Sequence, residues 1–358
     1  MKIIDRYIIK KFLSAFFFSI LLIIGLAIVI DLTEKIDDFV EKDAPLHAII
    51  FDYYLNFVPY YVNLFMFLFI FISVVFITSK MTQDTEIIAI ISSGVSFKRL
   101  MFPYFISALI LASLSFFLSN FVIPPANKIR LDFEDTYVNS TFYNKDRHIH
   151  RQISPGVYIY MENFNTRHNT GYQFSIEKFV DKSLVSKLMA QKVVWDSTVG
   201  KWKIHNYQIR TINGSDETFT GGLTVDSLMN FEPEDFKRRD TEKAKMDYFE
   251  LNEFIAESEL RGETNINNYL LEKHQRIAFP FSTFILTLIG VSISSRKRRG
   301  GTGLNIGIGL LISFMYLFFM QMASQFTIKG NWPAALSAWL PNIIFSFVAA
   351  FLYRLAPK

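Results

Sequence analysis

The sequence predicts an α-helical membrane protein with six transmembrane helices, three before and three after an inserted all-β domain. Of its 358 residues, 51% are hydrophobic. They collect in six blocks without Asp, Glu, Lys or Arg, each close to the roughly 20 residues needed to cross about 30 Å of hydrocarbon. Between the third and fourth blocks lies one long polar segment in which apolar residues alternate, as expected for half-buried strands. These observations fix the expected fold class.

The six apolar blocks define the expected spans. They run from Phe12 to Ile30, Phe57 to Ser79, Met101 to Ile123, Ile277 to Ser295, Gly303 to Ser324 and Pro333 to Tyr353. The first block is longer than the apolar part of a signal peptide and has no small-residue cleavage site after it, so we expect a retained span. Lys and Arg gather in the short loops on one side, which predicts that this side and both termini are cytoplasmic.

The insert follows the third span. Apolar and polar residues alternate in five stretches separated by turn residues: GVYIYMENF, YQFSIEKFV, KVVW, KWKIHNYQIRTI and ETFTGGLTV. Val157, Ile159 and Met161 should therefore share one sheet face, as should Trp202 and Ile204. A small sandwich or roll is expected. Farther on, Leu251, Phe254 and Ile255 recur at helical spacing. We therefore expect helices over 1–123, with a short one near 84–94, a β domain over 124–250, a connecting amphipathic helix over 251–276 and three helices over 277–358.

Several absences narrow the function. The sequence has no cysteine, which excludes disulfides, thiolate metal sites and a cysteine nucleophile. No G-x-x-x-x-G-K-[ST] phosphate loop is present, so the chain should not hydrolyse ATP by that route. The spans contain no ionisable residue, unlike those of most ion-coupled carriers. The net charge of +4 follows from the loop asymmetry and gives no reason to expect nucleic acid. We expect no catalytic residue and no metal, and interpret His148 and His150 as a surface pair rather than ligands.

The stretch QDTEIIAIISSGVS, Gln83 to Ser96, is too short and too polar to span a membrane. Thr82 or Asp84 could cap a helix there, and Gly94 could end it. The isoleucines at 87, 88, 90 and 91 should share one side, and Thr85, Glu86, Ala89, Ser92 and Ser93 the other. Two interpretations follow. The helix either lies idle at the membrane interface or presents its small polar side to a groove of another protein.

Four motifs in the same order resemble a known family. They are DRYIIKKFL at 5–13, QDTEIIAIISSGVS at 83–96, HQRIAFPFS at 274–282 and WPAALSAWLPN at 332–342. The chain resembles the lipopolysaccharide export permeases of the LptF/LptG type, also called the YjgP/YjgQ family. The resemblance implies a subunit of an ABC transporter in the bacterial inner membrane, with a β-jellyroll-like periplasmic domain.

The resemblance also implies partners. A paralogous permease would complete a heterodimer, and a cytoplasmic ATPase dimer would bind ATP and Mg, so that this chain itself holds no cofactor. The complex would extract lipopolysaccharide from the membrane lipid and pass it to periplasmic jellyroll bridge proteins. Which of the two permease positions this chain takes stays open. The alternative function is a membrane-anchored assembly or scaffold protein that binds a periplasmic partner through its β domain.

The family's functional regions can be carried over by position. The short helix would be the coupling helix that docks on the ATPase, through Asp84, Glu86, Ile87, Ala89, Ile90, Ser93 and Gly94. The first and fifth spans would form the lateral gate and lipid cavity, through Phe16, Ile20, Ile24, Gly307, Leu311, Phe314 and Phe318. Lipid phosphates would meet Lys35, Lys42 and Lys329.

The end of the first span departs from the family pattern. Asp31 and Glu34 stand where relatives tend to carry basic residues, and Lys35 and Lys42 follow. Three interpretations of this segment remain open: the lysines contact phosphate, a divalent cation bridges the two acids, or the segment is a solvated charged loop.

Overall fold

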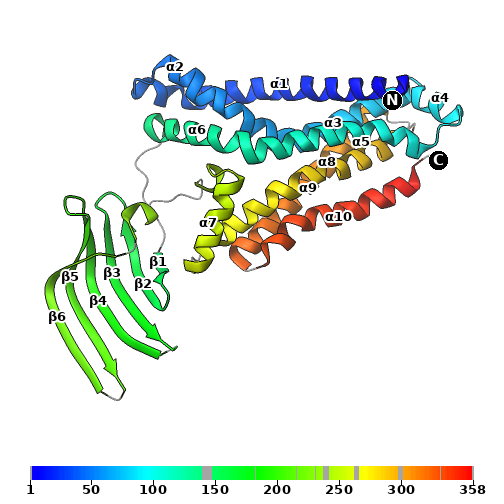
Figure 1. The fold of residues 1–358 in the computed structure, drawn as a ribbon. Coiled ribbons are helices and arrows are strands. Elements are labelled where there is room, and N and C mark those ends of the chain that lie inside the picture. The colour runs from blue at the N-terminus through cyan, green and yellow to red at the C-terminus, as the bar shows by residue number, and fades with distance from the viewer. Residues whose placement is uncertain are drawn as a thin grey trace. The chain divides into compact units, whose positions relative to one another are not determined.

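The structure, a computed structural model, describes residues 2–138, 147–181, 183–214, 216–229, 231–236, 242–261, 266–296, 301–330 and 332–356. The chain divides into two compact units (Figure 1). The helical unit comprises Met1–Val138, Ala244–Tyr248 and Asn267–Lys358, and the β unit comprises Asn139–Lys243 and Phe249–Ile266.

Within the described residues, six helical segments are long and apolar enough to cross a membrane, which confirms the expected three and three. The first three are α1 (Ile3–Glu41), the continuous run of α2 (Leu46–Ala48), η1 (Ile49–Tyr54) and α3 (Leu55–Gln83), and the continuous run of α5 (Phe97–Phe117), η2 (Leu118–Val122) and α6 (Ile123–Tyr137). The last three are α8 (Ile266–Ser294), α9 (Gly301–Gly330) and α10 (Ala334–Leu355). The short α4 (Glu86–Ser92) connects α3 to α5.

The first three helical segments extend well beyond their apolar blocks. The region between the first two blocks is mostly helix: α1 continues to Glu41, and α2 begins at Leu46. Two π-helical turns, η1 and η2, interrupt the second and third segments. Pro124 and Pro125 lie in the first turn of α6, one residue after η2, and cannot donate backbone hydrogen bonds. The regular helical ladder is therefore broken at that point.

Helix α3 is the centre of the helical unit. On one side Met66, Ile70 and Val74 join α1 and α5 in a buried apolar cluster. On the other side Phe71 and Val75 join α8, α9 and α10 in a second cluster. The first three and last three spans therefore meet along this one helix.

Small and hydroxyl-bearing residues let the other helices approach α3 closely. A Cβ atom on Gly290 of α8 would lie 2.8 Å from Val74 Cγ1. Thr82 Oγ1 donates a hydrogen bond of 2.8 Å to the carbonyl oxygen of Ser294, and Asn305 Nδ2 of α9 donates one of 2.9 Å to Ser79 Oγ. Such contacts drive helix association in lipid, where burying apolar surface against another helix gains little.

The β unit contains one antiparallel sheet in which each strand pairs with the next along the chain. The strands are β1 (Arg147–Ser154), β2 (Val157–Asn165), β3 (Thr170–Val180), β4 (Ser183–Asp196), β5 (Lys201–Asn213) and β6 (Asp216–Ser227). The 3-10 turns η3 (Pro233–Phe236) and η4 (Glu242–Ala244) and helix α7 (Tyr248–Arg261) follow in sequence. The expected β insertion is thus confirmed, and strand β1 precedes the region from which strands were predicted.

One face of the sheet is apolar. Ile159, Met161, Trp202 and Ile204 are buried in the same cluster, as their alternation predicts. Trp202 Nε1 donates a hydrogen bond of 2.9 Å to the carbonyl oxygen of Phe231, so the segment after β6 covers the tryptophan.

At the β5–β6 hairpin, the hydrogen bond from the Arg210 guanidinium holds the pKa of the Glu217 carboxyl below its usual value.

Two glycine substitutions test the packing on α3. Gly290→Ala should lower the thermal stability of the detergent-solubilised protein by about 1 to 3 kcal/mol, because the new methyl group overlaps Val74. Gly25→Ala is the matched control, since Gly25 is an exposed helical glycine with no atom within 4 Å of the added Cβ. That control should gain about 0.5 to 1 kcal/mol from lower chain entropy. Equal midpoints of thermal unfolding for the two variants would contradict this account.

Candidate functional site

Helix α4 is anchored at one end of the helical unit, beside both termini of the chain (Figure 1). Ile87 is fully buried, and Ile90 and Ile91 are partly buried against the cluster formed by α1, α3 and α5. Gly94 follows with φ of +88°, a left-handed conformation that glycine adopts without strain, and ends the helix as predicted. The helix is therefore held to its own spans by an apolar side.

Two details of α4 differ from the prediction. Ile88, expected on the buried side, is 43% exposed, because it lies about 100° around the helix from Ile87. Neither expected cap is used. Thr85 occupies the N-cap position with φ of +63° and no capping hydrogen bond from its side chain, and Thr82 belongs to α3. The residues that α4 exposes are Ile88, Ala89, Ser92 and Ser93, which we call its outer face.

Glu86 joins α4 to α1. Its carboxylate accepts hydrogen bonds from Tyr7 Oη at 3.0 Å and from Lys11 Nζ at 3.1 Å. The Lys11 ammonium also lies 4.3 Å from the centre of the Tyr7 ring. The Glu86 and Lys11 side chains are each 30% exposed, so water screens this ion pair and its main effect is to orient α4.

A second ion pair fixes the segment after α4. Arg99 of α5 donates two hydrogen bonds of 2.7 Å to the two carboxylate oxygens of Asp5 on α1. The Asp5 side chain is only 2% exposed, and the backbone N–H of Lys2 donates to it as well. A paired fork of this kind is strong and directional. Helix α4 is therefore bracketed by two contacts to the same stretch of α1.

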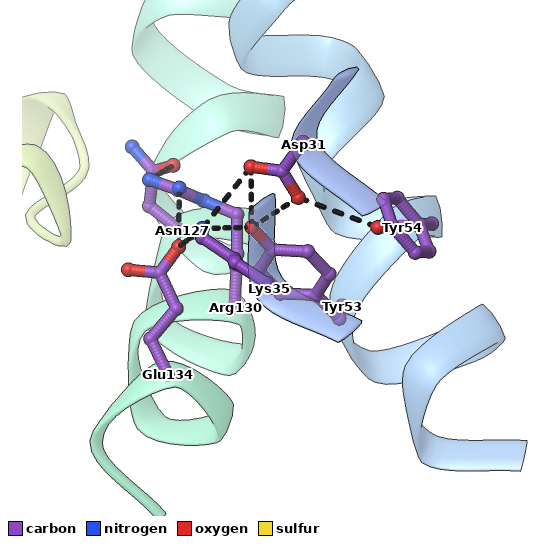
Figure 2. A network of polar contacts seen from close by, with 7 residues as sticks. All are labelled: Asp31, Lys35, Tyr53, Tyr54, Asn127, Arg130 and Glu134. Atoms are coloured by element: carbon purple, nitrogen blue, oxygen red, sulfur yellow. Dashed lines mark hydrogen bonds and ion pairs between the residues drawn. The ribbon is translucent and has the colours of Figure 1, made fainter. Parts of the chain in front are cut away.

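The opposite end of α1 carries a network of seven polar residues, Asp31, Lys35, Tyr53, Tyr54, Asn127, Arg130 and Glu134 (Figure 2). We call it the Asp31–Glu134 network. Lys35 Nζ lies 3.1 Å from Asp31 Oδ1 and 3.4 Å from Glu134 Oε1. Arg130 Nη1 lies 3.0 Å from the same Glu134 oxygen. Two cations thus face two anions, and the set is neutral.

The tyrosines of the π-helical turn η1 complete this network. Tyr53 Oη donates to Asp31 Oδ2 at 2.9 Å and contacts Lys35, and Tyr54 Oη donates to the same Asp31 oxygen at 3.4 Å (Figure 2). Phe39, Phe57 and Phe133 pack around Tyr53 and shield it from solvent. The network therefore ties α1 to η1 and α6.

The Asp31–Glu134 network bears on the three interpretations of the charged segment at the end of the first span. Asp31 and Lys35 lie on a helix and face a protein interior, so the solvated-loop interpretation is wrong for them. Lys35 already has two carboxylate partners. Lys42 and Lys329 are exposed. Among the described residues, no group of three or more His or carboxylate side chains could hold a metal ion.

Of the residues expected at the lateral gate, those on α1 are buried and those on α9 are exposed. Phe16, Ile20 and Ile24 are buried among α1, α3 and α5. Leu311, Phe314 and Phe318 on α9 are 61%, 60% and 61% exposed, and Gly307 has no neighbour within 4 Å of an added Cβ. Within one chain these two groups are not brought together.

The outward side of α1 carries other residues that the sequence did not single out. Phe17, Phe18, Leu21 and Leu22 are exposed there, at 50% or more. Because the charge-free block of α1 is apolar on all sides, no periodicity in its sequence separates the outward side from the buried one. The tyrosines of η1 could not be singled out either, because the π-helical turn that directs them toward Asp31 has no periodic pattern in the sequence.

Comparison with known proteins identifies one family. The model of the lipopolysaccharide export system permease LptF/LptG matches residues 6–355 of this chain. A search of curated proteins found no match to the chain.

Substitution of Lys35 tests whether the Asp31–Glu134 network is structural. Lys35→Met should lower the stability of the solubilised protein by about 1 to 3 kcal/mol, because it leaves the Asp31 and Glu134 carboxylates facing each other without a shared cation. Lys329→Met is the matched control at an exposed lysine. The measurement is thermal unfolding in one detergent, and an equal effect of both changes would exclude a structural role for Lys35.

Proposed function

This chain belongs to the lipopolysaccharide export system permease LptF/LptG family, and we propose that it extracts lipopolysaccharide from the inner membrane and passes it to a periplasmic bridge. Members are transmembrane subunits of an ABC transporter for lipopolysaccharide export, and the ATPase LptB hydrolyses the ATP. No cofactor is known for these permeases. The match over nearly the whole chain is the observation that carries the proposal.

The proposed orientation places α4 and both termini in the cytoplasm and the sheet in the periplasm. Five cations support it, because they lie near the start of α1 and near the ends of α3 and α5 that α4 connects: Lys2, Arg6, Lys10, Lys80 and Lys98. The opposite end holds the neutral Asp31–Glu134 network. In this orientation the β unit would face periplasmic jellyroll proteins, and β1 and β6, the edge strands of the described sheet, suit strand addition.

The proposed contact with the ATPase is the outer face of α4. Ala89, Ser92 and Ser93 are small and exposed, so a groove of the ATPase dimer could approach the helix closely, and Ile88 would add an apolar contact. Glu86 and Ile87 contact the helical unit rather than the outer face, and would hold α4 on α1 and α3. Asp84 and Gly94 lie at the ends of the helix, and Ile90 on its half-buried side.

The proposed lateral gate pairs two chains. In a heterodimer with a paralogous permease, the outward sides of α1 and α9 would each meet the corresponding helix of the partner. A gate surface must pack against another helix and separate from it when a lipid enters. The exposed apolar side chains of Leu311, Phe314 and Phe318 suit such a surface, as does Gly307, which has no neighbouring atom within 4 Å of an added Cβ. Phe16, Ile20 and Ile24 would support α1 from its buried side.

The docking proposal can be tested with tryptophan on α4. Ala89→Trp should reduce co-purification of the ATPase at least tenfold, because its bulk prevents close approach of the outer face. Ala350→Trp on the exposed side of α10 is the matched control and should leave the ATPase bound. Both variants should reach the membrane in equal amounts. Full retention of the ATPase by the α4 variant would refute docking through this face.

Site-specific photocrosslinking tests the gate. Crosslinkers at Leu311, Phe314 and Leu21 should capture lipopolysaccharide in the assembled transporter, and the yield should change when ATP is added. Crosslinkers at Phe347 and Phe351, which are exposed on α10, are the controls and should capture bulk lipid regardless of ATP. If all positions behave alike, the chain acts as a scaffold rather than a conduit.

A further inference from the structure

A basic groove lies between α1 and α3 near the end of the helical unit that carries α4. It has a volume of about 590 Å³. Lys10 and Lys11 border it from α1, and Lys80 borders it from α3. Phe18, Phe76 and Ile77 provide an apolar wall. Neither the proposed gate nor the outer face of α4 includes these three lysines.

The position of the lysines along their helices places them at a membrane surface. Lys10 and Lys11 come directly before the first charge-free block, and Lys80 comes directly after the second. Phe18 and Phe76 lie on the apolar side of those boundaries and are 65% and 41% exposed. The groove thus has cations at headgroup depth and aromatic rings at acyl-chain depth, which matches an amphiphile.

The charge balance of the groove favours an anion. Lys11 is paired with Glu86 at 3.1 Å. In the part of the chain that the structure describes, Lys10 and Lys80 form no ion pair, and both are exposed. Three cations and one carboxylate therefore leave an excess of positive charge above an apolar wall. Basic pockets between transmembrane helices on the cytoplasmic side bind the headgroups of anionic lipids.

We propose that this groove binds an anionic phospholipid of the cytoplasmic leaflet. The headgroup phosphate lies between Lys10 and Lys80, with Lys11 beside it, and one acyl chain follows Phe18 and Phe76. This assignment rests on the proposed orientation, in which the groove lies at the cytoplasmic end of the spans, away from the periplasmic bridge that would receive the exported substrate. Since Lys11 also holds Glu86, the lipid phosphate and the α4 carboxylate share a cation.

Photoactivatable lipids test the proposal. The full-length chain, purified with its partner subunits, would be placed in phosphatidylcholine nanodiscs with phosphatidylglycerol that carries a diazirine in its acyl chain. Labelling of peptides containing Phe18 and Phe76 should saturate at low phosphatidylglycerol content. Phosphatidylcholine with the same diazirine chain should label them only in proportion to its abundance. Equal labelling by the two lipids would overturn the proposal.

Charge variants locate the headgroup. Lys10→Gln with Lys80→Gln should weaken saturable phosphatidylglycerol labelling about 30-fold, which corresponds to about 1 kcal/mol for each lysine. Lys10→Arg with Lys80→Arg should retain it. Lys98→Gln with Arg354→Gln removes two exposed charges outside the groove and should have no effect. If this control weakens labelling as much as the first pair, the attraction is diffuse and no site exists.

A competition experiment identifies the source of the phosphate. Excess inorganic phosphate should leave the saturable labelling unchanged, because it cannot use the apolar wall. Complete competition would mean that the groove takes a free anion, which overturns the assignment to a lipid. Preparations without the ATPase should label equally, and loss of labelling there would mean that the site requires the ATPase.

Discussion

The close contact of α8 and α9 with α3 is the constraint on which the rest of the structure depends. Inside a bilayer, lipid tails are as apolar as the helices, so packing and hydrogen bonds must hold the helices together. Because Gly290 has no side chain, α8 can approach Val74 closely. Ser79 accepts a hydrogen bond from α9, and Thr82 donates one to α8. The two halves of the helical unit are therefore joined by one close helix contact, by side-chain hydrogen bonds and by the apolar cluster around Phe71.

Because α3 holds both halves, α1 can remain at the edge of the helical unit. One side of α1 packs on α3 and α5, while its other side exposes Phe17, Phe18 and Leu21. Polar contacts tie α1 at both ends, through Asp5 and Arg99 at one and the Asp31–Glu134 network at the other. An edge helix that is fixed at both ends and exposes one apolar side suits a surface that must contact lipid or another subunit.

The sequence was sufficient for features that depend on one period or one composition rule. Charge-free blocks predicted the six spans, alternation placed Ile159 and Met161 on one face of the sheet, and Gly94 marked the end of α4. It was insufficient where several segments decide the outcome. Whether Phe16 or Phe17 faces inward on α1 depends on α3 and α5, since both residues are equally apolar. Likewise, no local pattern revealed that Asp31 would meet tyrosines of a π-helical turn and Glu134 of α6.

The two ends of the helical unit use their cations differently, and this limits where anions can bind. At the Asp31–Glu134 network Lys35 and Arg130 are matched by two carboxylates, so a phosphate there would have to displace an existing partner. Breaking such largely buried pairs costs several kcal/mol before any new contact forms. In the groove near α4, Lys10 and Lys80 are exposed, and the carboxylate of Glu86 contacts only Lys11 of the three lysines. Among the described residues, an anion can therefore enter that groove without first breaking an ion pair of Lys10 or Lys80.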